Sequence, residues 1–198
     1  GNGSGTSTGG TVVLVHGMDD AGFTWDTLIP ELRQAAPAYG KSGIRIAIFE
    51  YPSCGSVSGA ADLLAANLEA ARSAGLTSLD VVAHSMGGLV VRDLLTRESL
   101  YNGDGTGGDR YPSVDRFIMV GTPNHGSSLV KCRAIFGFGT QIFRMCSGQR
   151  FSLCDSQDGH GEAGADLLPD SKLLQNLNDR PNPSHTRCTI IAGRWAPV

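Results

Sequence analysis

Short apolar stretches alternate with amphipathic stretches along most of the chain. Five stretches are apolar and rich in β-branched residues, which is typical of strands covered on both faces. They are Thr11–Val15, Ile44–Phe49, Leu79–Ala83, Arg116–Val120 and Cys188–Ala192. Apolar residues recur at helical spacing in Thr24–Ala36, Ala60–Ala71 and Met86–Thr96. This alternation predicts an α/β fold, with a mostly parallel sheet and helices on both faces.

The alternation ends at Gly126. Residues 126–186 contain no predicted strand, three of the five cysteines and one helical stretch near Ala165–Leu177. A connection of this length is often a lid or a binding loop. We expect a flexible leader over residues 1–10, followed by a single domain over residues 11–198. Within that domain, residues 126–186 form a lid-like or loop-rich excursion.

Composition narrows the class of partner. The net charge is -3 and no basic stripe is present, which argues against nucleic acid. No apolar run of 18 or more residues predicts a membrane span. The five cysteines show no zinc-ligand spacing, so we expect no metal. They predict either two disulfides in a secreted protein or five buried, reduced thiols.

The strongest chemical signal is a strand that runs directly into a helix through Ala83-His84-Ser85-Met86-Gly87. This is the spacing of the G-x-S-x-G nucleophile elbow, with alanine at the first small position. The sharp turn exposes the serine hydroxyl and brings the positions two before and two after it close together, so only small residues fit there. We predict Ser85 as a nucleophile; the alternative is an incidental serine in a Gly-rich turn.

The end of the first strand, at His16-Gly17-Met18, supplies a second part of the predicted site. An oxyanion hole needs two converging backbone N–H donors, one after the nucleophile and one after this strand. We predict Met86 and Met18 as these donors. The helix that begins at Met86 also directs its free N–H groups and positive dipole end toward the serine. We expect His16 to be a structural hydrogen-bonding residue under the loop.

Four sequence runs together resemble the small bacterial lipases and esterases of the α/β-hydrolase superfamily, the lipase class 2 and inositol-deacylase-like groups. The runs are LVHGM at 14–18, VVAHSMGGLVV at 81–91, FIMVGTPNHGSS at 117–128 and ADLLPDS at 165–171, with its helix continuing to residue 178. The resemblance implies the α/β-hydrolase fold and ester hydrolysis through an acyl-enzyme, without a cofactor.

The resemblance also implies a catalytic acid and a catalytic histidine, in the chain order Ser, Asp, His. In the relatives the acid follows the strand that matches Cys188–Ala192, and the histidine follows one further strand. Only Gly193–Val198 follow here, without an acid. We therefore expect the C-terminal strand, the acid and the histidine of the triad to lie beyond Val198.

Two alternatives stay open for the triad. One is a triad completed from within the chain, and the other is a hydrolase scaffold that binds without catalysis. The internal candidates are the histidines His125, His160 and His185 and the acids Asp155, Asp158 and Asp166. We expect His84 to pack under the elbow, and it is not a candidate base.

The chain is therefore predicted to be a serine carboxylic-ester hydrolase, a lipase or an esterase; the alternatives are an inactive binding protein and an acyltransferase. Apolar side chains in the excursion favour hydrophobic or lipid-like esters and contact with a lipid interface, although the same residues would also serve to pack the excursion on the sheet. They are Leu129, Val130, Ile135, Phe136, Phe138, Ile142, Phe143 and Met145.

Overall fold

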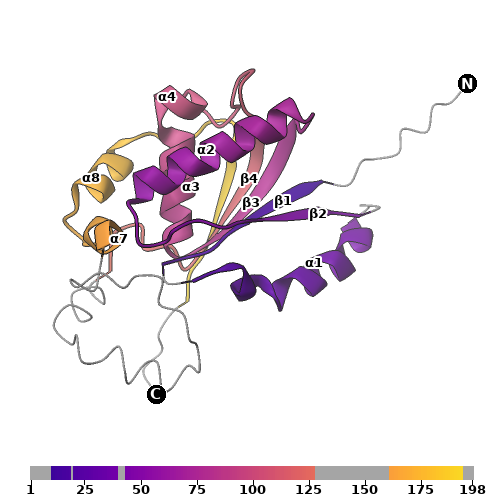
Figure 1. The fold of residues 1–198 in the computed structure, drawn as a ribbon, viewed down its shortest axis with the longest axis horizontal. Helices are drawn as coiled ribbons and strands as arrows, with labels where there is room; N and C mark the ends of the chain where they lie inside the picture. The colour runs from indigo at the N-terminus through magenta and orange to yellow at the C-terminus, as the bar shows by residue number, and fades with distance from the viewer. Residues whose placement is uncertain (1–9, 19, 40–42, 128–160, 194–198) are drawn as a thin grey trace, which may run out of the picture.

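A single parallel sheet organises the molecule. The structure, a computed structural model, describes residues 10–18, 20–39, 43–127 and 161–193. The strands are β1 (Thr11–Val15), β2 (Arg45–Phe49), β3 (Ser78–His84), β4 (Ser113–Val120) and β5 (Arg187–Ile191). They lie in the order β2-β1-β3-β4-β5, and every pairing is parallel. The carboxyl ends of all five described strands therefore lie on one edge of the sheet (Figure 1). The predicted parallel α/β architecture is confirmed.

Helices follow the described strands. They are η1 (Gly22–Trp25), α1 (Leu28–Ala35), η2 (Ala36–Tyr39), α2 (Val57–Ser73), α3 (Met86–Thr96), α4 (Glu98–Tyr101), α7 (Gly161–Asp166) and α8 (Lys172–Asp179), where η denotes a short 3-10 helix. The predicted bounds of α3 are confirmed. The stretch predicted as one helix over Thr24–Ala36 is interrupted before α1. Pro30 explains this, because it has no N–H to donate to the carbonyl of Asp26, so the hydrogen bonds of α1 cannot extend back across that residue.

The prediction of a single helical stretch over Ala165–Leu177 is wrong. Helix α7 ends at Asp166, and α8 begins only at Lys172. Pro169 lies in the gap and lacks the N–H that a continuous helix would require. Ser171 then caps the new helix, because its side chain accepts a hydrogen bond of 3.2 Å from the Leu174 N–H.

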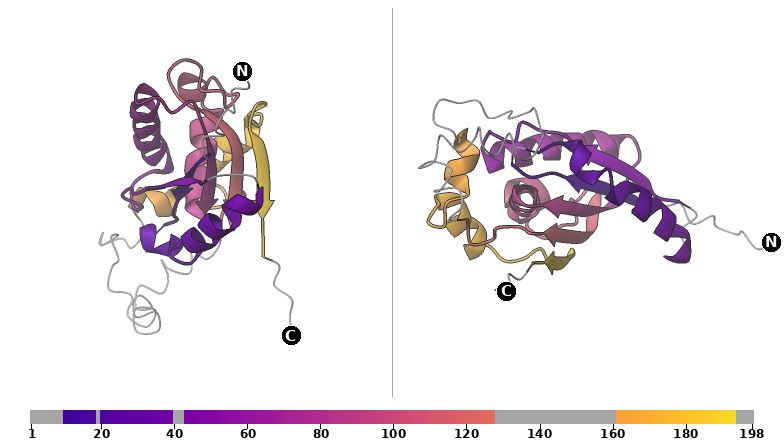
Figure 2. Two further views of the ribbon diagram at one scale, coloured as in Figure 1. Left: turned by 90° about the vertical axis from the view of Figure 1, so that its right-hand side faces the viewer. Right: turned by 90° about the horizontal axis from the view of Figure 1, so that it is seen from below.

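Alternate residues of the strands face two separate apolar layers. Val13 and Val15 of β1 belong to the larger core cluster, which also contains buried residues of α2 and α3. Leu14 belongs to a smaller cluster with Val82 and Trp25, against which α1 packs. Helices therefore cover both faces of the sheet, with α2 and α3 on one face and α1 on the other (Figures 1 and 2).

The two outer strands differ from the prediction of strands covered on both faces. All five residues of β5 are exposed, including Ile190 at 59% and Ile191 at 53%. In β2 only Phe49 is buried. The central strand β3 has the expected burial, because it has a strand on each side and α3 across it. An apolar, β-branched pattern therefore predicts a strand without telling a central position from an edge.

A buried carboxylate fixes α3 to the chain that follows α8. Asp93 is 1% exposed and accepts hydrogen bonds from Arg97, one turn later, and from Arg180 Nη1 at 2.7 Å. Removing one partner from such a buried charge pair is strongly destabilising. The helix that begins at the candidate nucleophile is therefore held at its far end by charge as well as by apolar packing.

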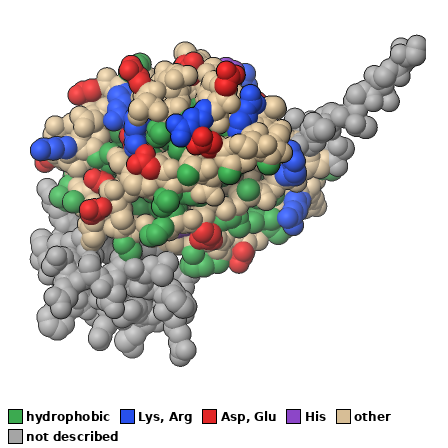
Figure 3. All heavy atoms as spheres, turned by 45° about the horizontal axis from the view of Figure 1, so that its top comes forward, with side chains coloured by type: hydrophobic (Ala, Val, Ile, Leu, Met, Phe, Trp, Pro, Cys, Tyr) green, Lys and Arg blue, Asp and Glu red, His purple; other side chains and the backbone are tan. Residues whose placement is uncertain are grey.

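The distribution of surface charge bears on the prediction that no basic stripe is present. On the face seen in Figure 3, acidic and basic side chains are intermixed and form no single-sign stripe. None of the helices in the described residues is long and apolar enough to span a membrane.

Cys54 is disulfide-bonded, whereas Cys188 has a free thiol. The other three cysteines lie outside the described residues, so the prediction of two disulfides stays a prediction.

Candidate active site

Ser85 has an unusual backbone conformation. Its φ of 52° and ψ of −127° place it in a region that residues with a Cβ avoid, and Asn102 is the other described non-glycine residue with positive φ. Ser85 is the N-cap of α3, yet its side chain makes no capping hydrogen bond. Because an N-cap serine normally uses its oxygen on its own helix, this hydroxyl is left available for other chemistry.

Small residues and one backbone hydrogen bond hold this turn in place. The Ser85 N–H donates to the carbonyl of Val120 at 2.9 Å, which continues the ladder between β3 and β4. A Cβ added at Gly87 would lie 2.4 Å from the carbonyl oxygen of His16, so only glycine fits there. Ala83 is fully buried on the strand side. The constraint at position 87 comes from Val15 and His16, and the predicted closeness of positions 83 and 87 stays a prediction.

The chain after β1 approaches the serine closely. A Cβ added at Gly17 would lie 2.9 Å from Ser85 Cβ and 3.4 Å from Ser85 Oγ. Met18 follows Gly17, and Met86 is the first residue of α3. The two predicted amide donors therefore belong to segments that meet at Ser85, and their convergence on one oxyanion stays a prediction.

His16 is a buried part of the scaffold. It is fully buried, its Nδ1 lies 2.9 Å from the Gly17 carbonyl oxygen, and its ring stacks on Tyr51 with centroids 4.4 Å apart. The Tyr51 hydroxyl donates to the His16 carbonyl at 2.8 Å. Burial, with a smaller effect of Asp20, raises the pKa of Tyr51 above its usual range. This arrangement supports the structural role expected for His16.

A contact between a histidine and a carboxylate lies beside the elbow. His84 Nδ1 is 3.5 Å from Asp20 Oδ2, and the Asp20 side chain is 16% exposed. The other oxygen, Oδ1, accepts from the Ala21 N–H at 2.9 Å and from the Thr24 hydroxyl. The His84 side chain is 42% exposed, so the expectation that it packs under the elbow is wrong. It lies beside the elbow, facing the chain that follows β1.

Two of the runs that carry the family resemblance contact each other. The loop after β4 is held to the chain after α7 by a 2.9 Å hydrogen bond from the Ser127 N–H to the Leu167 carbonyl. Arg92 of α3 donates to Asn124 in the same loop at 2.9 Å and to the Leu177 carbonyl at 3.1 Å. The loop, α3 and α8 therefore form one polar network.

The internal triad candidates have different positions. His185 lies on the wrong edge of the sheet, since its Nε2 is 3.5 Å from Asp115 near the start of β4, whereas Ser85 bonds the end of β4 at Val120. Five strand residues separate those two points by roughly 16 Å. The pairing of His185 with Ser85 is therefore wrong, because a base must lie within hydrogen-bond reach.

The acid Asp166 already has a structural partner. Its Oδ2 accepts from the Val57 N–H at 2.8 Å, near the start of α2. Burial raises the pKa of Asp166, which works against an ionised orienting acid. His125 is exposed in the loop after β4, on the same sheet edge as Ser85. His160, Asp155 and Asp158 lie outside the described residues.

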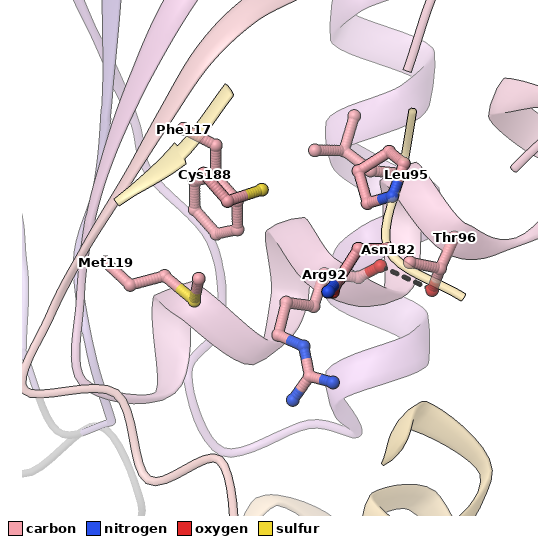
Figure 4. Close-up of a pocket in the computed structure, with 8 residues that line it drawn as sticks. Arg92, Leu95, Thr96, Phe117, Met119, Asn182 and Cys188 are labelled. Carbon is pink, nitrogen blue, oxygen red and sulfur yellow. Dashed lines mark hydrogen bonds between the residues drawn. The ribbon is translucent and has the colours of Figure 1, made fainter. Parts of the chain in front are cut away.

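A small pocket lies between α3, β4 and β5 (Figure 4). Its lining residues are Arg92, Leu95, Thr96, Phe117, Met119, Asn182, Pro183 and Cys188. Its volume of about 10 Å³ is enough for one water molecule. Leu95 lies ten residues after Ser85, about 15 Å along α3. The pocket therefore does not belong to the candidate site.

The part of the chain that the structure describes holds no group of three potential metal ligands.

Sequence reasoning did not find Asp20, Glu50 or Tyr51 at this edge. Glu50 and Tyr51 follow β2, and Glu50 Oε1 accepts from the Gly22 N–H at 2.7 Å. A signal was available, because polar residues directly after parallel strands meet at one edge of the sheet. The strand order, which places β1 between β2 and β3, was the missing information.

Comparison with known proteins places the chain in a family. Residues 3–145 match the model of DUF7379, which is described as a domain of unknown function. The chain belongs to the DUF7379 family. No curated protein matches it.

Several solved structures share the fold. A Bacillus licheniformis lipase, BlEst2 in its mature form, is 21% identical with a TM-score of 0.63, and the match covers 94% of this chain and 66% of that one. The phospholipase PlaB of Legionella pneumophila is 17% identical with a TM-score of 0.60, over 91% and 38% of the two chains. A metagenomic carboxyl esterase, MGS0156, is 18% identical with a TM-score of 0.56, over 94% and 50%.

These likenesses show that the chain has the α/β-hydrolase fold predicted from its sequence. The neighbours are lipases and esterases, which supports a hydrolase scaffold. The chain spans no more than 66% of the length of any of the three, so their activities are not carried over as facts.

We predict that Gly17→Ala lowers the free energy of unfolding by about 1–3 kcal/mol, because the new methyl group would overlap Ser85 Cβ. Urea unfolding followed by circular dichroism measures the change. Gly43→Ala is the matched control, since a Cβ there meets no atom within 4 Å. Equal stability of the two variants would show that the chain after β1 does not approach the elbow.

We predict that Tyr51→Phe lowers the free energy of unfolding by about 1–3 kcal/mol at pH 7, because the His16 carbonyl loses its buried donor. The difference from the wild type should shrink as pH rises above 10. The folded-state pKa of Tyr51 is raised, so its contribution is complete below the unfolded-state value of about 10 and is lost at higher pH. Urea unfolding from pH 7 to 11 measures this, and a difference that grows with pH would contradict it.

Proposed function

We propose that the chain is a serine carboxylic-ester hydrolase with Ser85 as its nucleophile. The observation that carries the proposal is the strained backbone of Ser85 at the start of α3, with a hydroxyl that does not cap its own helix. Strain of this kind clusters at active sites, where the surrounding structure enforces it. The lipase and esterase folds among the structural neighbours support the same reaction class.

In the proposed reaction, Ser85 Oγ attacks the ester carbonyl carbon while a histidine accepts its proton. The carbonyl oxygen becomes an oxyanion, held by the backbone amides of Met18 and Met86. Collapse of this intermediate expels the alcohol, which takes the proton from the histidine. Water then hydrolyses the acyl-enzyme by the same steps in reverse. That the triad acid and histidine lie beyond Val198 stays a prediction.

The proposed substrates are hydrophobic or lipid-like esters. Support comes from the apolar character of residues 126–186, although the eight apolar residues that suggest it lie outside the described residues. We propose that this excursion is a lid on a single domain over residues 11–198, and that it contacts a lipid interface.

A secreted location is part of the proposal. Cys54 is disulfide-bonded, and disulfides persist mainly in oxidising compartments such as the cell exterior.

We predict that Ser85→Ala abolishes hydrolysis of a short p-nitrophenyl ester, with a fall in kcat of about a million-fold, to background. It should also abolish labelling by a fluorophosphonate probe, which reacts with activated serines. Ser85→Gly should be equally inactive yet more stable than Ser85→Ala by about 1 kcal/mol, because glycine accepts positive φ without strain.

Retained turnover in both Ser85 variants would reject the assignment of Ser85 as the nucleophile. A wild-type protein that neither labels nor hydrolyses any ester would favour a binding protein on a hydrolase scaffold. Acyl transfer to an added alcohol, in preference to water, would indicate an acyltransferase.

The substrate class has its own test, which is kcat/KM across p-nitrophenyl esters of increasing acyl length. Each methylene buried in an acyl site should contribute up to about 0.8 kcal/mol, or roughly fourfold in kcat/KM. We expect kcat/KM to rise with length from two to eight carbons. A steep fall beyond four carbons would instead indicate an esterase for small esters.

A further inference from the structure

We infer that Asp20 is a positioning residue that acts through His84 to hold the chain after β1 against the nucleophile elbow. The inference rests on the proposed function, since that chain carries the proposed Met18 amide donor. Asp20 follows β1 and His84 ends β3, so the contact joins the two adjacent strands at the edge where Ser85 lies.

His84 has unfilled hydrogen-bonding capacity. Its Nδ1 atom is hidden from solvent and makes no hydrogen bond within the described residues. Asp20 Oδ2 lies 3.5 Å away, about 0.6 Å beyond a normal N–H···O separation. A buried polar atom without a partner is costly, so a small movement that brings these two atoms together is favourable.

The Asp20 carboxylate is oriented by its own hydrogen bonds. Its Oδ1 is occupied by the Ala21 N–H and the Thr24 hydroxyl, which fixes the carboxylate and leaves Oδ2 directed at His84. The carboxylate is therefore a rigid part of the segment that follows β1, and it reaches the residue immediately before Ser85.

The same segment has a second contact with the elbow. Gly17 packs on Ser85 so closely that no side chain would fit between them. Met18 lies in sequence between Gly17, which touches Ser85, and Asp20, which faces His84. The two contacts together fix the position of the Met18 amide relative to Ser85 Oγ. Loss of either should move the donor away from the oxyanion, and a misplacement of 1 Å costs about 100-fold in rate.

The test is a double-mutant cycle on the full chain with Asp20→Ala, His84→Ala and the double variant. Two readouts are measured: amide hydrogen exchange of peptides that cover the chain after β1, and kcat and KM for a short p-nitrophenyl ester. We expect each single variant to speed exchange in those peptides and to lower kcat about tenfold, with KM changed less than about twofold. In the double variant, the fall in kcat and the rise in amide hydrogen exchange should be no larger than in either single variant.

Asp115→Ala and His185→Ala are the matched controls. That pair has the same 3.5 Å separation but lies at the opposite edge of the sheet, so both readouts should stay at the wild-type level. Thr24→Val removes one hydrogen bond to Asp20 and leaves the contact with His84, and it should have a smaller effect than Asp20→Ala.

Unchanged exchange in His84→Ala, or additive losses in the double variant, would overturn the inference. An equal rise in KM and fall in kcat would also overturn it, since that would indicate loss of substrate binding. If the wild-type protein neither labels nor hydrolyses esters, the proposed function fails, and the exchange cycle still decides whether the two residues act as a pair.

Discussion

The candidate site depends on one constraint, which is the positive φ imposed on Ser85. A residue with a side chain pays about 1–3 kcal/mol for such a conformation, so the neighbouring structure must enforce it. Three contacts do so. The Val120 carbonyl accepts the Ser85 N–H, the His16 carbonyl excludes any side chain at position 87, and Gly17 packs against Ser85 Cβ. The first contact comes from β4 and the other two come from the chain directly after β1, so the turn exists only when β1, β3 and β4 are in register.

The parallel sheet explains how residues distant in sequence reach this turn. Because β1 lies between β2 and β3, the polar residues that follow these strands share one edge. Tyr51 supports the His16 carbonyl from the β2 side, while Asp20 faces His84 on the β3 side. The segment after β1 is therefore fixed between two neighbours. A segment held in this way can carry a backbone donor that needs little reorganisation during a reaction, which is the property that an oxyanion site requires.

Much of this arrangement could be predicted from local patterns, and the rest depended on strand order. The elbow was predictable because Ala83, Ser85 and Gly87 stand at fixed offsets between an apolar strand and an apolar helix, all within one turn. The gap between α7 and α8 was also predictable, because Pro169 breaks a helix and Ser171 caps the next one. Apolar periodicity alone does not detect either effect. The exposure of β5 and the contact of Asp20 with His84 could not be predicted, because an edge position and a pair separated by 64 residues are properties of the assembled sheet.

The same geometry restricts where a catalytic base can come from. A nucleophile and its amide donors arise from one strand-to-helix turn and the adjacent loop, but a histidine must be delivered by a different loop to the same edge. In a parallel sheet that loop has to follow a strand, because the residues before a strand lie at the opposite edge. His185 precedes β5 and pairs with Asp115 near the start of β4, so it is too far away. His125 follows β4 directly and is the described candidate that satisfies the rule, and any base elsewhere in the protein must likewise lie on a connection that reaches the edge where the strands end.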